Sequence, residues 1–250
     1  MRKIIARLVA VLVFILAAFV VYKTYDSTYF HKSISDFIEQ GENFANNKPV
    51  VPEDVADTTT NGKFVHYIAI YWRDFQNLNN EMDAETTRML NVFDAKNLQS
   101  DQTIATNLEK MNDYRALIQQ KSDGIEQNVQ TFIKNISSLD ADDLKIGNIS
   151  QVKSEVAKDT EFRQNIVDIR KTIASYMYAG LEFLQSRRQT LTFADNGAIT
   201  FANPADQKYF YDLMAVIKAS DEMLKGLMTQ NRNDIRESTT ALRAAYDKAK

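Results

Sequence analysis

The chain contains two histidines, His31 and His66, and no cysteine. Histidine is a common metal ligand and a general acid or base near neutral pH. A zinc site needs several such ligands at defined spacing, as in the sequence HExxH, and neither histidine has a second imidazole at helical spacing. We therefore predict no metal site, no cofactor and no catalytic histidine. We interpret His66 as a partly buried residue beside the apolar position Phe64.

Carboxylate pairs are the next groups whose spacing permits chemistry. Glu81 and Asp83 form one pair, and Glu155 and Asp159 form another. For one of these carboxyl groups to act as a general acid, burial or a neighbouring like charge must raise its pKa. No sequence feature indicates either condition. We therefore interpret both pairs as solvated helix surface. The stretch 140–143 lacks the glycine and glutamate of a calcium loop and predicts an acidic turn. No nucleophile elbow, phosphate-binding loop or dinucleotide fingerprint occurs, and we predict no enzyme activity.

Arginine and tyrosine side chains are the remaining candidates for contact with a ligand or partner. Arg115 follows Tyr114 on a helical pattern, and we predict it on the apolar side of that helix, where its guanidinium needs an anionic partner. That partner is either a carboxylate of the protein or an anionic ligand. Arg187 ends a later pattern whose second half is rich in aromatic residues, which form either a groove or part of the core. The candidate contact residues are Arg115, Arg187, Tyr176 and Tyr178.

The apolar spacing that must position these groups is helical over most of the chain. Seven glycines and three prolines in 250 residues leave few interruptions. Steps of three and four between apolar residues indicate amphipathic helices packed in a bundle. A short pattern from Tyr29 to Phe44 precedes a break that runs to about Asn61. Four long patterns follow, over about 64–82, 104–136, 152–184 and 210–246.

Two helix starts and one hairpin have specific signals. We predict Ser150 as the N-cap of the pattern that begins at Val152, and Asn203 as the N-cap before Pro204. Residues 190–201 contain two short alternating runs around an Asn-Gly pair, which tolerates the positive φ of tight hairpin turns. The apolar residues of this hairpin should pack against the bundle, because an isolated hairpin is marginal in water. These residues are Leu191, Phe193, Ile199 and Phe201.

The fold class that these patterns predict is all-α. The architecture is an extracytoplasmic antiparallel bundle of about four long helices with one short β-hairpin at 190–201. We expect residues 1–24 to be a transmembrane anchor with its N-terminus in the cytoplasm. Residues 25–61 are then a juxtamembrane helix and linker, and residues 62–250 form the helical bundle domain.

The run from Leu8 to Tyr22 is apolar without interruption and carries basic residues on both sides. Counted from Ile4, with the flanking charges reaching the interface, it approaches the roughly 20 residues that a spanning helix needs. No small-residue cleavage motif follows, so we favour an uncleaved signal-anchor over a signal peptide. The positive-inside rule places the rest of the chain outside the cytoplasm. We predict a single-pass inner-membrane protein with its bulk in the periplasm or another extracytoplasmic space.

The charge balance restricts the partners. The net charge is −3, and the anchor region holds four positive charges and no acid, which leaves about −7 for the exported part. An acidic body without a basic face does not fit a nucleic-acid partner, because phosphate recognition needs clustered lysine and arginine. The partners that remain are the membrane, through the N-terminal helix, and an envelope protein.

Several stretches together resemble one known family. They are Phe64-Val-His-Tyr-Ile-Ala-Ile-Tyr with Gln76 and Met82, then Tyr114-Arg-Ala-Leu, then Phe193-Ala-Asp-Asn-Gly-Ala-Ile-Thr-Phe201 followed by Tyr209 to Leu213. They are similar to the YiaF-like family of bacterial envelope proteins, whose members carry an exported helical region with a late F-x-x-N-G-I-x-F element. Family members begin as lipoproteins, whereas this chain lacks the cysteine that a lipid would modify. The resemblance implies location and architecture and assigns no functional residue.

The sequence leaves two functions open. The first is a non-enzymatic, membrane-anchored envelope protein whose helical bundle binds a protein or a cell-envelope component. The second is a small-ligand-binding extracytoplasmic bundle with a pocket near the hairpin and Arg115 or Arg187. A pocket lined by aromatic residues beside an unpaired arginine would favour the second function, and an exposed apolar or aromatic stripe would favour the first.

Overall fold

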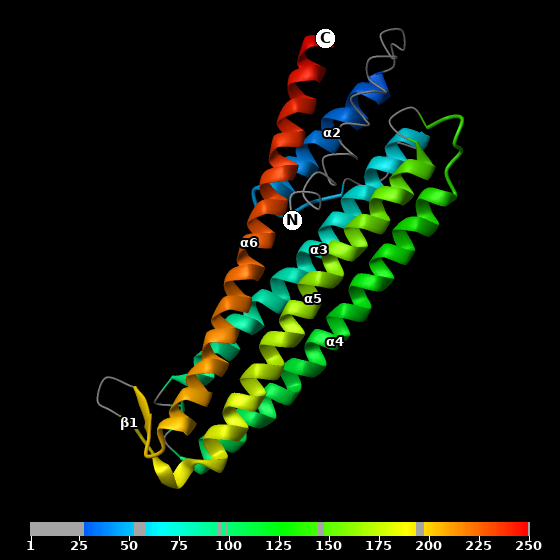
Figure 1. Cartoon of the computed structure of the whole chain (residues 1–250). Helices are drawn as coiled ribbons and strands as arrows, with labels where there is room; N and C mark the ends of the chain where they lie inside the picture. Colours follow the sequence, from blue (N-terminus) through cyan, green and yellow to red (C-terminus); the bar gives the residue numbers. More distant parts are fainter. Residues whose placement is uncertain are drawn as a thin grey trace. The chain divides into compact units, whose positions relative to one another are not determined.

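The computed structural model describes residues 28–52, 59–94, 97–98, 100–144, 148–193 and 198–249. Five α-helices, two short 3-10 helices and one two-stranded antiparallel sheet form the main regular structure of these residues (Figure 1). The helices are α2 (Thr28–Ala45), α3 (Thr60–Leu90), α4 (Asp101–Ser137), α5 (Ile149–Ser186) and α6 (Pro204–Ala249). The 3-10 helices are η1 (Asn91–Phe93) and η3 (Arg188–Thr190), and the strands are β1 (Leu191–Phe193) and β2 (Ile199–Phe201). The prediction of a mostly helical chain with one short hairpin is confirmed at this level.

Side-chain capping fixes the start of two long helices. The Oδ1 atom of Asn203 accepts a hydrogen bond from the N–H of Ala205 at 2.9 Å, so Asn203 caps α6 as predicted. The prediction that Ser150 caps α5 is wrong. Helix α5 begins at Ile149, and the Oδ1 atom of Asn148 accepts a hydrogen bond from the N–H of Gln151 at 3.2 Å. An asparagine oxygen placed two residues before Ser150 already satisfies this free amide, so the helix starts earlier.

The predicted hairpin strands are present. Strands β1 and β2 pair antiparallel, with Leu191 opposite Phe201 and Phe193 opposite Ile199. Leu191, Ile199 and Phe201 are buried, and Phe193 is half-buried. One apolar face of the hairpin is therefore packed, as alternation along a strand requires. The predicted turn, at residues 194–197, lies outside the described residues.

The described chain divides into two compact units. Unit 1 consists of the described residues up to Leu78, of Gly124–Gln164, and of the chain from Leu227 onward. Unit 2 consists of Asn79–Asp123 and Asn165–Gly226. The division falls within α3, α4, α5 and α6, so each unit contains segments of the same four helices. Helix α2 belongs to unit 1.

Aromatic packing and one close helix contact build the core of unit 1. The ring centroid of Trp72 lies 5.4 Å from that of Phe37 and 6.1 Å from that of Phe44, which joins α3 to α2. A Cβ atom at Gly41 would lie 2.5 Å from the Cγ2 atom of the buried Thr239 on α6. Only glycine permits this approach of α2 to α6. The helix predicted to lie beside the membrane is therefore an integral part of the core of unit 1.

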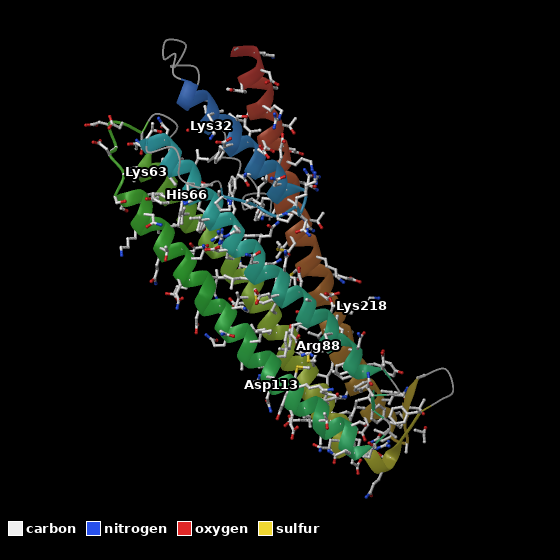
Figure 2. The ribbon with its side chains drawn as sticks, turned by 180° about the vertical axis from the view of Figure 1, so that it is seen from behind. Lys32, Lys63, His66, Arg88, Asp113 and Lys218 are labelled. Atoms are coloured by element: carbon white, nitrogen blue, oxygen red, sulfur yellow. The ribbon has the colours of Figure 1, made fainter. Side chains whose placement is uncertain are left out.

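Unit 2 packs the end of α5 against the start of α6. The ring centroids of Phe183 and Tyr209 lie 4.8 Å apart, which places these two helix ends side by side. A Cβ atom at Gly180 would lie 3.0 Å from the Cε atom of Met214. Charged side chains such as Asp113 on α4 and Lys218 on α6 project from this unit into solvent (Figure 2).

Within the described residues, no helix combines the length and the apolar character that a membrane span requires. The predicted anchor, at residues 1–24, lies outside the described part of the chain, and so does the side chain of His31.

Candidate functional site

A groove with a volume of about 400 Å³ lies between α3 and α4 in unit 1. This volume is within the roughly 300–1,000 Å³ of small-molecule sites. The lining residues recur at steps of three and four on each helix, so each set occupies one helix face. Helix α3 contributes Tyr67, Ile70, Tyr71, Asp74, Asn77 and Leu78. Helix α4 contributes Gly124, Gln127, Asn128, Thr131, Phe132 and Asn135.

Two stacked aromatic rings form the inner wall of the groove. The ring centroids of Tyr71 and Phe132 lie 4.5 Å apart at an interplanar angle of 22°, and both side chains are buried. The guanidinium carbon of Arg163, on α5, lies 3.9 Å from the centroid of the Tyr71 ring and 4.0 Å from that of Phe75. Cation–π attraction of this kind strengthens when the cation is desolvated. The groove is thus backed by a buried cation held between rings.

Hydrogen bonds connect this cation to two groove residues. The Nε atom of Arg163 donates to Asp159 Oδ2 at 2.6 Å, and its Nη1 atom donates to Asn128 Oδ1 at 3.0 Å. The hydroxyl of Tyr71 donates to the same Asp159 oxygen at 2.5 Å. Burial raises the pKa of Tyr71 well above its ordinary value, an effect that Arg163 opposes and Asp159 reinforces. The phenol therefore stays protonated and holds its bond to Asp159.

Several polar side chains of the groove have no hydrogen-bond partner among the described residues. They are Asn77, Gln127, Thr131 and the side-chain amide of Asn135. Two other glutamines of α4 are paired along the helix. Gln119 donates to Asp123 at 2.8 Å, and Gln130 donates to Glu126 at 3.1 Å. The groove therefore presents donors and acceptors that its own walls leave unused.

The groove has little net charge. Asp74 is its one carboxylate, and its Oδ1 atom already accepts a hydrogen bond from Arg73 Nε at 2.8 Å. The guanidinium of Arg163 is occupied behind the wall. No group of three or more potential metal-ligating side chains occurs in the part of the chain that the structure describes. The arrangement suits a polar ligand without formal charge.

Arg115 is exposed, so the prediction that it lies on the apolar side of α4 is wrong. The buried positions there are Met111, Tyr114 and Ile118, and this spacing leaves Arg115 beside the buried face. Its guanidinium carbon lies 5.3 Å from the centroid of the Tyr178 ring on α5. The structure brings these two predicted contact residues together at the surface of unit 2.

Arg187 has a carboxylate partner in the protein. Its Nε atom lies 2.9 Å from Asp206 Oδ2, and its guanidinium carbon lies 5.4 Å from the centroid of the Phe183 ring. The structural salt bridge that the sequence left open is therefore formed. Tyr176 is exposed on α5. A role in ligand or partner contact stays a prediction for these residues.

The aromatic cluster near the hairpin is divided between the core and the surface of unit 2. The ring centroid of Phe201 lies 5.6 Å from that of Phe183 and 5.6 Å from that of Phe210, and both Phe201 and Phe210 are buried. Tyr209 and Tyr211 remain exposed at its edge. Of the two sequence interpretations, packing in the core describes Phe201 and Phe210, whereas Phe183 and Phe193 are half-buried.

The predicted carboxylate pairs are separated into individual ion pairs. Glu81 pairs with Lys121, and both Glu81 and Asp83 are exposed, as predicted. The interpretation as solvated surface is wrong for Glu155 and Asp159, which are largely buried. Their charges are compensated by Lys158 and Arg163 on the same helix.

The acidic stretch and the second histidine agree with their predicted roles. The N–H of Asp142 donates to Asp140 Oδ1 at 2.9 Å in an exposed turn. His66 is half-buried on the first turns of α3, with its ring centroid 6.1 Å from that of Tyr67 (Figure 2).

Sequence reasoning missed two buried arginines on α5. Arg163 lies in unit 1 and Arg170 in unit 2. Both follow the buried spacing of Ile166 and Ile173 in steps of three and four. The apolar residues Phe162 and Ile169, each one position before one of these arginines, are only half-buried. The signal was present, because each arginine continues the apolar seam of its helix.

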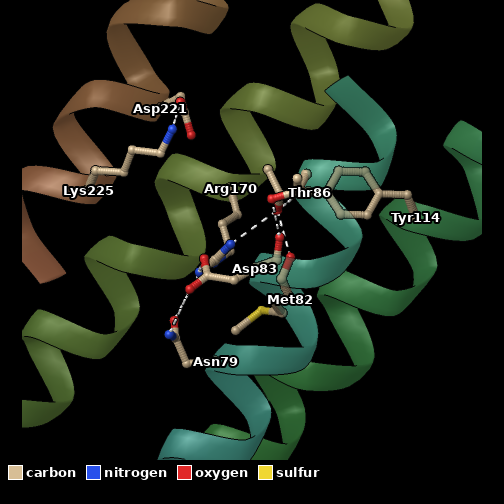
Figure 3. A network of polar contacts seen from close by, with 9 residues as sticks. Asn79, Met82, Asp83, Thr86, Tyr114, Arg170, Asp221 and Lys225 are labelled. Carbon is tan, nitrogen blue, oxygen red and sulfur yellow. Dashed lines mark hydrogen bonds and ion pairs between the residues drawn. The ribbon is translucent and has the colours of Figure 1, made fainter. Parts of the chain in front are cut away.

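Arg170 has its own polar network in unit 2 (Figure 3). Its Nη2 atom donates to Asn79 Oδ1 at 2.9 Å and to Asp83 Oδ1 at 2.6 Å, and its Nη1 atom donates to Thr86 Oγ1 at 3.1 Å. The hydroxyls of Thr86 and Tyr114 lie 2.5 Å apart. The network ties α3, α4 and α5 together within this unit.

Comparison of the chain with protein-family models, with curated proteins and with solved structures gave no significant match.

Proposed function

We propose that this protein is a non-enzymatic, membrane-anchored envelope protein that binds a cell-envelope component in the groove between α3 and α4. The observation that carries the proposal is the set of polar groove side chains without partners among the described residues. Polar groups at a binding site supply orientation and specificity when a ligand completes their hydrogen bonds. The groove volume of about 400 Å³ also fits a small ligand or one segment of a larger molecule.

The chemistry of the groove supports binding rather than catalysis. Asp74 is the one carboxylate of the lining, and it is paired with Arg73. Acid–base catalysis typically uses two titratable groups with different pKa values, such as the two carboxyl groups of glycoside hydrolases. The lining supplies one carboxyl group. Asp159 lies close by, but it accepts hydrogen bonds from Arg163 and Tyr71. Both bonds go to its Oδ2 atom, which ties this carboxylate to the wall of the groove.

The location belongs to the proposal and rests on the sequence. An apolar run with basic residues before it supports an N-terminal signal-anchor that leaves the bulk of the chain in the periplasm. The YiaF-like resemblance supports the same placement. A protease-protection assay with a C-terminal tag tests it: digestion of the tag from the extracytoplasmic side is expected, and protection of the tag would contradict the topology.

Site-specific photo-crosslinking in intact cells tests the groove. The full-length chain carries a photoreactive phenylalanine analogue at Gln127, inside the groove, or at Gln130, three residues further along the same helix. Both glutamines are exposed, but Gln130 lies outside the groove lining and is paired with Glu126. Adducts at Gln127 and none at Gln130 are the expected result. Identical adducts at both positions, or none at Gln127, would remove the groove as the binding site.

A further inference from the structure

We propose that the occupant of the α3–α4 groove is a neutral glycan segment that carries hydroxyl and acetamido groups. This inference rests on the proposed function and specifies the chemical class of the ligand. The supporting observations are the charge of the groove, its mixture of carboxamides and rings, and its length along the helices.

The charge of the groove argues for a neutral ligand. An anionic ligand needs an accessible cation, and the nearest guanidinium in the wall, Arg163, is 2% exposed and already bonded to Asp159 and Asn128. A cationic ligand needs a free carboxylate, and Asp74 already has a partner in Arg73. An anionic ligand would therefore enter without a cation to compensate it, and the one carboxylate of the lining is already paired with an arginine.

The polarity of the groove argues against an amphipathic helix. Such a helix binds by inserting its apolar face into an apolar groove. Half of this lining consists of polar side chains, and three of them are exposed: Asn77, Gln127 and Thr131. Covering these groups with aliphatic side chains would leave their donors and acceptors without partners, at the cost of their desolvation.

Carboxamides match the hydrogen-bonding groups of a glycan. Each amide side chain offers an oxygen acceptor and an NH₂ donor in one plane, and a sugar hydroxyl both donates and accepts. An acetamido group can pair with a carboxamide through the same two bonds. Arg163 fixes the oxygen of Asn128, and the NH₂ of Asn128 has no partner among the described residues. One donor of the groove is thus oriented before any ligand enters.

An aromatic ring in the lining and the length of the groove also fit a glycan. Tyr67 is half-buried in the lining, so part of its ring can cover the C–H face of a sugar. The lining of α3 extends from Tyr67 to Leu78, which corresponds to about 16 Å along the helix axis at 1.5 Å per residue. A groove of this length and modest volume fits a linear chain of rings better than a single sugar.

Calorimetric titration of the full-length protein in detergent micelles tests the inference. The probes are tri-N-acetylchitotriose, which carries acetamido groups, and maltotriose, which carries hydroxyls alone. We expect chitotriose to bind more tightly than maltotriose. The double variant Gln127→Ala/Asn135→Ala should weaken chitotriose binding by about tenfold or more, since two hydrogen bonds are lost. The control Gln130→Ala should leave the affinity unchanged within about twofold.

Each outcome decides the inference. Binding of chitotriose that the groove variants do not weaken would place the glycan elsewhere and overturn it. Equal affinity for both saccharides would overturn the acetamido part. No binding of either saccharide, with specific crosslinks still formed from Gln127, would overturn the glycan and leave the proposed function standing, with an extended peptide as the next occupant to test. Circular dichroism of the variants confirms that the fold is retained.

Discussion

Arg163 in unit 1 and Arg170 in unit 2 are both buried cations on α5, but their carboxylate partners differ in access to water. Asp159, the partner of Arg163, is 10% exposed. Asp83, the partner of Arg170, is 51% exposed. The two arginines are seven residues apart, a spacing that returns to the same helix face. Helix α5 therefore places an arginine on the same face in both units, and the positive charge of each arginine is compensated in a different way.

This difference indicates that the exposure of the carboxylate, as much as that of the arginine, decides how much a buried ion pair contributes to stability. In unit 1 both charges are removed from water, so each depends on the other for compensation. In unit 2 the carboxylate keeps its hydration, and Arg170 depends partly on the neutral acceptors of Asn79 and Thr86. The Nε atom of Arg170 has no hydrogen-bond partner among the described residues. The pair in unit 1 also holds two residues of the groove wall.

The largest effect should follow from Arg163→Met. This change leaves Asp159 buried with the Tyr71 hydroxyl as its remaining donor, and removal of one member of a buried pair costs about 3–5 kcal/mol. The loss of unfolding free energy is measured by denaturant titration, with the fluorescence of Trp72 as the signal. Trp72 is the single tryptophan of the chain and lies in unit 1. The matched control is Arg73→Met, which breaks an ion pair at the surface and should cost less than about 1 kcal/mol. Equal losses in the two variants would show that the Arg163 pair is not desolvated.

Asp83→Asn should have an intermediate effect on unit 2. The new amide oxygen can still accept from Arg170, but the fully buried cation loses its compensating charge, for an expected loss of about 1–3 kcal/mol. Hydrogen exchange of peptides from α3 and α5 in unit 2 measures the loss. Unchanged exchange would mean that neutral acceptors alone compensate Arg170.

Arg170→Met should cost about 1–2 kcal/mol, because the Oδ1 atom of the buried Asn79 loses its donor, and this loss should stay below that of Arg163→Met. The released Asp83 is half-exposed and can be hydrated, and Thr86 keeps its bond to the carbonyl of Met82 at 2.7 Å. The same hydrogen-exchange peptides report the result. A loss as large as that of Arg163→Met would abolish the distinction between the two units.

The smallest differences should appear at alkaline pH. Burial raises the pKa of Tyr71 strongly and that of Tyr114 less strongly, both from an ordinary value of 10.0. A raised folded-state pKa means that stability is complete below pH 10 and is lost as the pH rises from there through the folded-state value. Tyr71→Phe and Tyr114→Phe should each make this alkaline loss shallower, with the larger change for Tyr71.

Unfolding midpoints of the wild type and of both tyrosine variants, measured between about pH 8 and 11, test this expectation. Identical slopes in all three proteins would contradict the burial of the phenols. A larger change for Tyr114 would reverse the comparison between the units.

Local signals in the sequence predicted most of the secondary structure. The helical spacing gave four long helices, and Asn203 with Pro204 marked the start of α6. The alternation of apolar and polar residues correctly predicted both strands of the hairpin. The start of α5 was missed because Asn148 and Ser150 are both good caps, and the choice between them depends on which oxygen reaches a free amide.

The candidate site was not predicted. Sequence reasoning expected a pocket near the hairpin with Arg115 or Arg187, whereas the groove lies in unit 1 between α3 and α4. Polar residues such as Asn77 and Gln127 look like ordinary solvated helix surface in a sequence. Only the pairing of two particular helix faces shows that they lie opposite each other.

The sequence by itself determined where helices and strands form, because apolar periodicity and caps act over a few neighbouring residues. Only the tertiary structure decided which charges are buried and which polar groups remain without partners. Arg163, Arg170 and Arg115 have the same side chain, and two of them are buried while the third is exposed. Their burial depends on the helix faces opposite them, which come from distant parts of the chain.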